Sequence, residues 1–306
     1  MKIAVVGAGA MGSLFGGLLA EAGREVWLFD IWQEHVDTIN RQGLHLEHAG
    51  KSRSINVRAT LDAAQIGQVD LAVVFVKSTI TAAAAKTAAR LLTPEGMVIT
   101  LQNGMGNAEA IAEYIDASKI LVGTTSHGAT FLGPGTIRHA GVGATILGAW
   151  KASDKNRTSA RHVAEFFSNS NIETEAVDDV LQVVWGKLLV NVGINAITAL
   201  TGIKNGELLD LEVTKSLSRS AVEEAIAVAR AQGITPREDA VEHVFQVADA
   251  TAPNRSSMGQ DVDHHRQTEI DAINGFIVRE AHRLGLEAPV NFALTALIET
   301  LQGHFE

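Results

Sequence analysis

Hydrophobic and polar residues follow one another along the first half of the chain in a repeating order. Short runs at residues 2–6, 69–76 and 97–101 are almost wholly apolar, which is typical of strands that are covered on both faces of a sheet. Residues 10–22 and 79–92 are rich in good helix formers, and glycine or proline follows each of them. This alternation of strands and helices predicts an α/β fold with a doubly wound parallel sheet.

The pattern changes in the second half of the chain. Residues 44–57 predict an inserted hairpin, and glycine-rich residues 126–148 predict short antiparallel strands added to the same domain. Beyond residue 178 no strand pattern remains. Helical patterns cover residues 179–201, 213–232, 239–250, 260–284 and 291–302. We therefore predict a nucleotide-binding domain at residues 1–178 and an all-α substrate and catalytic domain at residues 179–306.

The first apolar run leads into the motif Gly7-x-Gly9-x-x-Gly12, followed by a helical pattern. Gly7 would allow a tight turn, Gly9 would let a pyrophosphate approach the backbone, and Gly12 would let the helix pack closely on the strand. Ala10 and Met11 open that helix, whose N-terminal N–H groups suit phosphates. The alternative is a βαβ turn that binds no phosphate. Because Asp30 ends the next strand, where a ribose would be held, the context favours a dinucleotide site.

Composition narrows the classes of partner. The net charge of −10 and the absence of a Lys/Arg run argue against nucleic acid, and the chain has no cysteine for a disulfide or a thiolate metal site. His264 and His265 point to different helix faces without further ligands, so no metal site is predicted. No leader and no uninterrupted apolar stretch of about 20 residues is evident, which predicts a cytoplasmic enzyme that does not span a membrane.

One polar line interrupts the apolar helix predicted at residues 179–201. Lys187, Asn191 and Asn195 are spaced i, i+4 and i+8, so they share one face. A helix this apolar is buried, and its polar line therefore needs a partner, a ligand or a cleft. The alternative is a solvated stripe with a snorkelling lysine. A dehydrogenase acting on a C–OH/C=O pair needs a proton donor and charge stabilisation at oxygen, and a lysine of tuned pKa provides both.

Five further residues could carry chemistry, and each has an ordinary structural alternative. Lys77 and Asn103 follow buried strands, where a cofactor would lie, although a lysine there can be a rim charge and Asn103 can form a turn. Ser256 or Ser257 could cap the next helix. Glu269 lies among apolar residues, so a lysine of a neighbouring helix is its expected partner.

Taken together, these segments resemble the ketopantoate reductase (2-dehydropantoate 2-reductase) family from the first strand to about Pro289. The matching segments are Gly7-x-Gly9-x-x-Gly12, Lys77, Asn103-Gly-Met-Gly106, Lys187-Leu-Leu-Val-Asn191-Val-Gly-Ile-Asn195, Asn205-Gly-Glu-Leu208, Ser256-Ser-Met-Gly-Gln-Asp261 and Thr268-Glu-Ile-Asp-Ala-Ile-Asn-Gly275. The resemblance implies a Rossmann domain, a helical C-terminal domain and a substrate in the cleft between them.

The resemblance also implies roles for individual residues. Lys187 would be the general acid and Glu269 its orienting partner. The substrate would be bound by Asn103 and Asn191 near the reacting centre, by Asn195 at its hydroxyl and by Ser257 at its carboxylate, and Lys77 would lie between cofactor and substrate.

One position departs from the family pattern. Members that use NADPH place a basic residue after the second strand, where this chain has Asp30-Ile31-Trp32. A carboxylate there accepts hydrogen bonds from the ribose hydroxyls and repels a 2′-phosphate, unless Asp30 only caps the next helix. We therefore expect NAD(H) to be preferred over NADP(H).

The sequence as a whole predicts an oxidoreductase that acts on a small branched 2-oxo/2-hydroxy acid, ketopantoate or pantoate first. A dehydrogenase of a different 2- or 3-hydroxy acid and a non-catalytic NAD(H)-binding sensor are the alternatives. The apolar helical domain permits a homodimer.

Overall fold

A computed structural model describes residues 1–305 of the 306-residue chain. The chain divides into two compact units. We name the first the sheet unit, which comprises Met1–Gln102 and Asn107–Val180. The second, the helical unit, begins at Leu181 and also contains the distant segment Asn103–Gly106. The assignment of a separate function to each domain stays a prediction.

An eight-stranded sheet forms the centre of the sheet unit within the described residues. Its strands are β1 (Lys2–Val6), β2 (Glu25–Phe29), β5 (Arg58–Thr60), β6 (Val69–Val74), β7 (Leu92–Thr100), β8 (Ile120–Thr125), β11 (Thr145–Ala149) and β12 (Thr174–Ala176). Their order is β12-β11-β8-β7-β6-β1-β2-β5, and β1 pairs in parallel with both β2 and β6. Only the β8–β11 pair in this sheet is antiparallel among residues 1–305. The carboxyl ends of β1 and β2 therefore lie at the same edge of the sheet.

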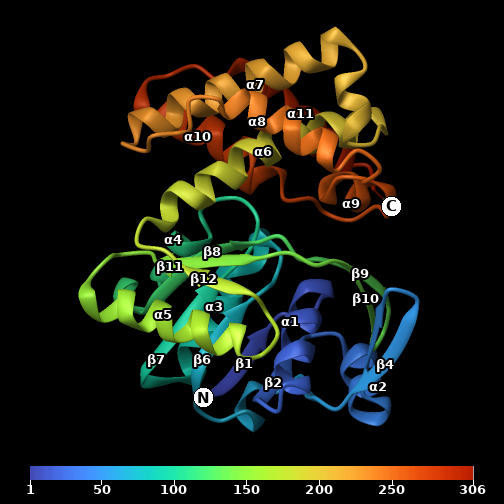
Figure 1. Ribbon diagram of the computed structural model, residues 1–306, viewed down its shortest axis with the longest axis vertical. Helices are drawn as coiled ribbons and strands as arrows, with labels where there is room; N and C mark the ends of the chain where they lie inside the picture. Colours follow the sequence, from blue (N-terminus) through green and yellow to red (C-terminus); the bar gives the residue numbers. More distant parts are fainter. Residues whose placement is uncertain (306) are drawn as a thin grey trace. The chain divides into compact units, whose positions relative to one another are not determined.

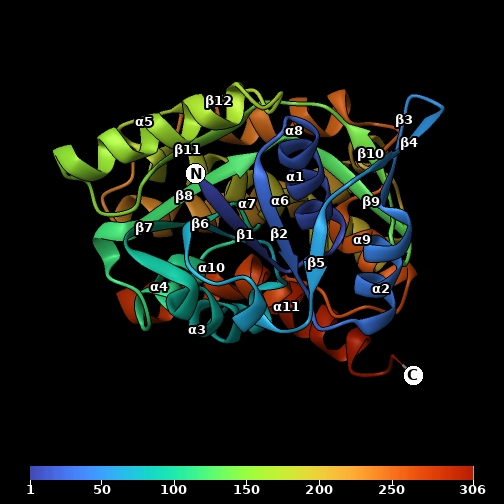
Figure 2. The ribbon, with the colours of Figure 1, turned by 90° about the horizontal axis from the view of Figure 1, so that it is seen from below.

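Helices cover both faces of this sheet, which explains why its central strands are apolar throughout. The helices are α1 (Ala10–Glu21), α2 (Gln33–Gln42), α3 (Thr81–Leu91), α4 (Asn107–Ala112) and α5 (Asp154–Ser168), with short 3₁₀ helices η1 (Ala63–Gln65), η2 (Ser78–Ile80) and η3 (Ala117–Lys119). Phe15 of α1 and Phe167 of α5 share one core, whereas Leu91 of α3 packs with Ala4 and Val69 in another. Figure 2 shows α1 and α5 on one side of the sheet and α3 and α4 on the other.

A second, four-stranded sheet lies beside α1 and α2 in the sheet unit (Figure 1). It contains β3 (Leu44–His48), β4 (Lys51–Ile55), β9 (Gly128–Gly133) and β10 (Thr136–Gly141) in the order β4-β3-β10-β9. The hairpin predicted from residues 44–57 is therefore present. The pieces predicted as antiparallel additions separate into two sheets: β11 is antiparallel to β8 in the large sheet, whereas β10 is antiparallel to β9 and pairs in parallel with β3 of the hairpin. Alternation of residue types marks a strand but does not identify its neighbour.

The helical unit consists of helices packed around α6. Its elements are α6 (Val180–Thr201), η4 (Gly206–Leu209), α7 (Glu212–Ala231), α8 (Ala240–Ala250), α9 (Ser257–Asp263), η5 (Ile270–Ala272), α10 (Asn274–Leu284) and α11 (Pro289–Gln302). The core contains Trp185 and Val192 of α6, Val222 of α7, Val244 of α8 and Ile277 of α10. The predicted α/β class with an all-α C-terminal region is confirmed.

The helix predicted at residues 260–284 is wrong. The chain forms α9, then leaves the helix at His265, whose φ is 51°, and resumes through η5 into α10. Residues 264–269 are polar and lack an apolar face that could pack on a neighbouring helix. Glu269 therefore lies immediately before η5 and not on a long helix.

Helix α6 bears on the prediction that no segment spans a membrane, although Lys187, Asn191 and Asn195 interrupt its apolar sequence. In the described part of the chain it is the one helix that is long and apolar enough to cross a membrane, by length and composition only, with a mean hydropathy of 1.5 over its most apolar 18 residues. Of that window 61% is buried inside the protein, as in a core helix. Burial against other helices thus accounts for its apolar composition.

Candidate active site

The glycine-rich loop after β1 has the geometry that its three glycines predict. Gly7 has a φ of +97°, which L side chains rarely adopt, and a Cβ on Gly12 would lie 1.9 Å from the Gly7 carbonyl oxygen. A Cβ on Gly9, in contrast, would meet nothing within 4 Å. Two of the glycines therefore build the turn, and the third leaves open space beside the backbone.

The N-terminus of α1 follows directly from this loop. Gly9 is its N-cap residue, and within residues 1–305 no side chain caps the helix. The first N–H groups of a helix have no partner inside the helix and carry its positive dipole end. Backbone N–H groups around Ala10, Met11 and Gly12 next to open space fit the phosphates of a dinucleotide.

Asp30, at the end of β2, lies against the same loop. Its Oδ2 accepts a hydrogen bond from the Ala8 N–H at 2.7 Å, and its Oδ1 accepts from Ile31 N and Trp32 N at 2.8 and 3.0 Å. The N-cap residue of α2 is Trp32. Asp30 thus orders the turn before α2 and holds a half-buried carboxylate beside the loop, where a ribose fits.

In the helical unit, Lys187 lies in the first half of α6 with a half-buried side chain. Burial, which disfavours the charged ammonium, lowers the pKa of Lys187 to about 8, and the nearby negative charge of Glu269 opposes this shift. The lysine can therefore both hold and release a proton near neutral pH. The electrostatic coupling of Lys187 with Glu269 places the two residues close together.

One and two turns further along α6 lie two asparagine side chains. The Nδ2 atoms of Asn191 and Asn195 are buried, and neither has a hydrogen-bond partner in residues 1–305. An unpaired buried amide donor costs free energy, so such donors are uncommon in folded proteins. These donors fit the oxygen atoms of a polar ligand on the same helix face as Lys187.

The segment Asn103–Gly106 joins this group, although it follows β7 of the sheet unit. Met105 N donates a hydrogen bond to the Ala272 carbonyl at 2.8 Å. A Cβ on Gly104 would lie 2.4 Å from that same oxygen, so only glycine allows the approach. Asn103 is thereby tied to η5, which directly follows Glu269.

The two serines that could cap α9 have different environments. Ser256 is the N-cap residue: its Oγ accepts from Gly259 N at 3.1 Å and lies 2.7 Å from the Thr198 hydroxyl of α6. Ser257, the first residue of α9, is exposed. The structure therefore leaves Ser257 available to a ligand and gives Ser256 a structural role.

Lys77 is exposed at the end of the turn after β6, in the sheet unit. Gln102 stabilises this turn by donating from Nε2 to Val76 O at 2.6 Å. Lys77 belongs to the sheet unit, and its place between cofactor and substrate stays a prediction. In the part of the chain that the structure describes, no three His, Asp or Glu side chains form a metal site.

Sequence reasoning gave no role to Asn274, the first residue of α10. Its side chain is fully buried, and Nδ2 donates to Val192 O at 3.3 Å and to Asn291 Oδ1 at 2.9 Å. Asn291 in turn donates to Glu224 Oε2 at 2.7 Å. This network links the turn of α6 that carries Asn191 to α10, α11 and α7. An asparagine inside the apolar run 272–278 is the signal that could have indicated it.

Comparisons with known proteins agree with this arrangement. The family described as "Ketopantoate reductase PanE/ApbA" matches residues 3–152, and its C-terminal counterpart matches residues 179–302. The chain is 39% identical over 303 residues to the 2-dehydropantoate 2-reductase of Halobacterium salinarum and 37% identical over 306 residues to that of Pyrococcus abyssi, with 99% of each chain covered.

Solved structures give the same fold. A PanE/ApbA family ketopantoate reductase from Ralstonia eutropha JMP134 superposes with a TM-score of 0.90 at 32% identity, covering 99% of both chains. A D-mandelate dehydrogenase bound to NADH and anilino(oxo)acetate has a TM-score of 0.93 at 29% identity, covering 100% of this chain and 99% of that one. By sequence and by fold, the chain belongs to the ketopantoate reductase family.

Proposed function

We propose that this protein is an NAD(H)-linked oxidoreductase that interconverts a small branched 2-oxo acid and its 2-hydroxy acid, with ketopantoate and pantoate as the pair. The observation that carries the proposal is the polar face of α6, where Lys187 with a pKa of about 8 precedes two buried, unpaired amide donors. A catalytically silent sensor would not need a proton donor of tuned pKa beside such donors.

In this proposal the two units supply different parts of the reaction. Gly7 shapes the turn, backbone N–H groups around Gly9, Ala10, Met11 and Gly12 hold the pyrophosphate, and Asp30 accepts hydrogen bonds from the ribose. A bound nicotinamide supplies a hydride to the carbonyl carbon during reduction and accepts it during oxidation.

Lys187 acts as the general acid in the reduction. Its ammonium donates a proton to the carbonyl oxygen as the C=O bond becomes C–H and C–OH, and the neutral amine remains. Glu269 favours the protonated form, since its charge raises the pKa of Lys187. In the oxidation the neutral amine of Lys187 takes the hydroxyl proton.

The other predicted residues bind the substrate. Asn103 and Asn191 contact it near the reacting centre, Asn195 donates to its hydroxyl, and Ser257 binds its carboxylate. Lys77 contacts both cofactor and substrate. A cytoplasmic location and a homodimer stay predictions of the same kind.

A second candidate substrate class has its own support. The fold superposes closely on the ternary structure of a D-mandelate dehydrogenase with NADH, so a 2-hydroxy acid with another side chain fits the same scaffold. Both the Asp30 carboxylate and this likeness to an NADH complex support NAD(H) as the cofactor.

A substrate panel tests the proposal. Oxidation of NADH and of NADPH, followed by absorbance, is measured with ketopantoate, phenylglyoxylate and other 2-oxo acids of graded side chains. We expect the highest kcat/KM with ketopantoate and NADH. A maximum with phenylglyoxylate favours the second candidate, and no turnover with any acid contradicts an enzymatic role.

A further inference from the structure

Two polar side chains lie fully buried behind the glycine-rich loop and have no place in the chemistry above. Ser13, in the first turns of α1, has 0% of its surface exposed, and His35 of α2 has 1%. Buried polar groups nearly always have hydrogen-bond partners, and a chain of such partners fixes the groups at its ends. The partners of Ser13 and His35 therefore indicate what they hold.

These side chains connect the loop to the four-stranded sheet. Ser13 Oγ donates to the Ala8 carbonyl at 2.7 Å, and His35 Nε2 lies 3.3 Å from Ser13 Oγ. On the other side of the ring, Gly135 N donates to His35 Nδ1 at 2.9 Å. Because Nδ1 accepts, the proton of the neutral ring is on Nε2, which therefore donates toward Ser13.

We call the hydrogen-bonded series Ala8–Ser13–His35–Gly135 the relay. Ala8, at one end of it, is the middle residue of Gly7-Ala8-Gly9. Its N–H donates to Asp30, so both backbone polar groups flanking its Cα have fixed partners. A trans peptide is planar, and the Gly9 N–H therefore points away from the Ala8 carbonyl. Holding that carbonyl through Ser13 orients the Gly9 N–H on the side opposite to Ser13, next to the open space beside Gly9.

The far end of the relay is fixed as well. Gly135 lies in the turn between β9 and β10, and its carbonyl accepts from His45 N of β3 at 2.8 Å. The His35 ring packs against Trp32 and Phe131, with ring centroids 6.1 and 5.2 Å away, and these two rings also stack on each other at 5.4 Å. The four-stranded sheet thus anchors His35 by a hydrogen bond and by ring contacts.

We propose that Ser13 and His35 are positioning residues for the nicotinamide cofactor: they hold the Ala8 carbonyl to the four-stranded sheet and so keep the Gly9 N–H aimed at the pyrophosphate. This inference rests on the proposed function, which places a dinucleotide at the loop. It gives the inserted sheet a role in cofactor binding.

Protonation of His35 breaks the relay, because both ring nitrogens then donate and Nδ1 faces the Gly135 N–H. Burial lowers the pKa of His35 from its ordinary value of 6.5, and the charge of Asp30 partly opposes the shift. The titratable and charged groups on this residue's own helix and on neighbouring elements are Glu21 on α1, Asp30 after β2, Glu34, Asp37 and Arg41 on α2, His45, Glu47 and His48 on β3, Arg58 on β5, and Arg138 and His139 on β10. Because the pKa of His35 is lowered from 6.5, affinity for NADH should fall only as the pH drops below 6.5 and the ring becomes protonated.

The test is a fluorescence titration with NADH of the full chain and of variants, with melting temperatures measured in parallel. Ser13→Ala removes the bond to Ala8, and His35→Asn keeps an acceptor near Gly135 but cannot reach Ser13. Each single variant should raise the Kd for NADH about ten-fold. The double variant should have a Kd no higher than that of either single variant, because each substitution already interrupts the same series of hydrogen bonds. His139→Asn, a buried histidine of the same sheet outside the relay, is the matched control and should leave the Kd unchanged.

The pH dependence provides the second readout. Between about pH 8 and about pH 5 the Kd of the parent protein should rise, whereas that of His35→Asn should stay flat. A Kd for Ser13→Ala within two-fold of the parent value contradicts the relay but leaves the proposed function standing. Additive effects of the two substitutions on the Kd of the double variant do the same. A parent protein that binds neither NADH nor NADPH contradicts the proposed function and, with it, this inference.

Discussion

The glycine-rich loop of the sheet unit and the polar face of α6 in the helical unit differ in the groups that they can offer to a ligand. The loop offers backbone: Gly7 and Gly12 shape it by lacking side chains, and α1 has no side-chain cap among the described residues. The α6 face offers side chains, a lysine of lowered pKa and two amide donors held in an apolar helix. Recognition of a shared cofactor can rely on the backbone, whereas proton transfer and substrate choice need particular side chains.

Lys187 of the helical unit is the proposed proton donor, so Lys187→Ala should have the largest effect. Loss of the proton donor and of charge stabilisation at oxygen should lower kcat by a factor on the order of 10²–10⁴. The Kd for NADH should hardly change, since the groups proposed to bind it belong to the sheet unit.

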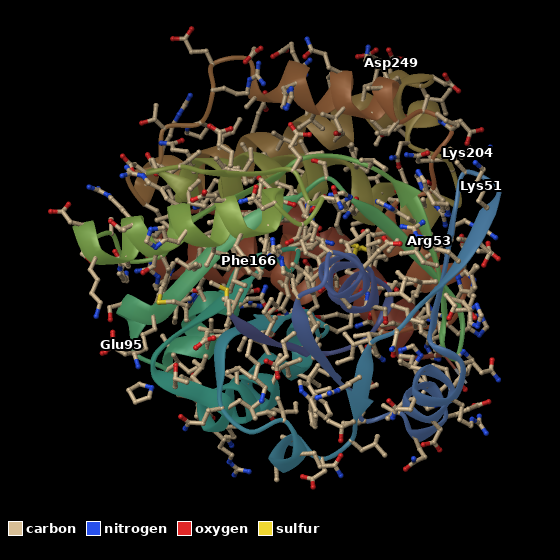
Figure 3. All side chains as sticks on the ribbon, turned by 60° about the horizontal axis from the view of Figure 1, so that its bottom comes forward. Lys51, Arg53, Glu95, Phe166, Lys204 and Asp249 are labelled. Carbon is tan, nitrogen blue, oxygen red and sulfur yellow. The ribbon has the colours of Figure 1, made fainter. Side chains whose placement is uncertain are left out.

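Lys204 provides the control for that variant. It is an exposed lysine of the helical unit, at the surface in Figure 3, and Lys204→Ala should keep the parent kcat. A kcat near the parent value in Lys187→Ala would contradict the proposal that Lys187 is the proton donor.

Cofactor choice tests whether the loop region discriminates through a side chain. The Asp30 carboxylate should disfavour a 2′-phosphate by about 100-fold in kcat/KM, from like-charge repulsion at a partly exposed site. Asp30→Ala should reduce this preference, whereas Asp37→Ala, an exposed carboxylate on α2, should not. Equal kcat/KM for NADH and NADPH in the parent protein means that Asp30 does not face the ribose.

Substrate capture should depend on the amide donors of α6. Asn195→Ala removes a buried donor and should raise the KM for the 2-oxo acid by about one to two decades, with a smaller change in kcat. Ser257→Ala should act in the same direction. A fall in kcat at constant KM would instead place these residues in the chemical step.

The smallest expected effect is a shift along the pH axis. The proposed reduction needs protonated Lys187, and Glu269 raises the pKa of that ammonium. Glu269→Ala should therefore move the alkaline limb of the pH–kcat profile, near pH 8 in the parent protein, to lower pH. Asp249→Ala, which removes an exposed carboxylate visible at the surface in Figure 3, should leave the profile in place. An unchanged alkaline limb in Glu269→Ala would contradict the prediction that the Glu269 carboxylate raises the pKa of Lys187.

Local patterns revealed much of the fold and of the loop. The turn at Gly7, the close contact at Gly12 and the open space at Gly9 depend on residues within one turn of each other, so a motif specifies them. The same holds for the spacing of Lys187, Asn191 and Asn195 along one helix. Each of these features needs only short-range geometry.

Long-range partners could not be predicted in this way. The parallel pairing of β10 with β3 joins residues about 90 positions apart, and the Asn274–Val192 bond joins two helices. The end of α9 at Asp263 depends on which residues find an apolar surface to cover, and that surface exists only after folding. Periodicity detects an amphipathic face but not the element that receives it.

The segment Asn103–Gly106 has a consequence for how the chain becomes folded. Because it packs with the helical unit, the polypeptide passes between the two units three times, after Gln102, after Gly106 and after Val180. The bond from Met105 to Ala272 closes a loop of roughly 170 residues, so that part of the unit can form only after most of the chain has been synthesised. A protease cut after residue 180 would accordingly separate the C-terminal helices from a piece of their own structure.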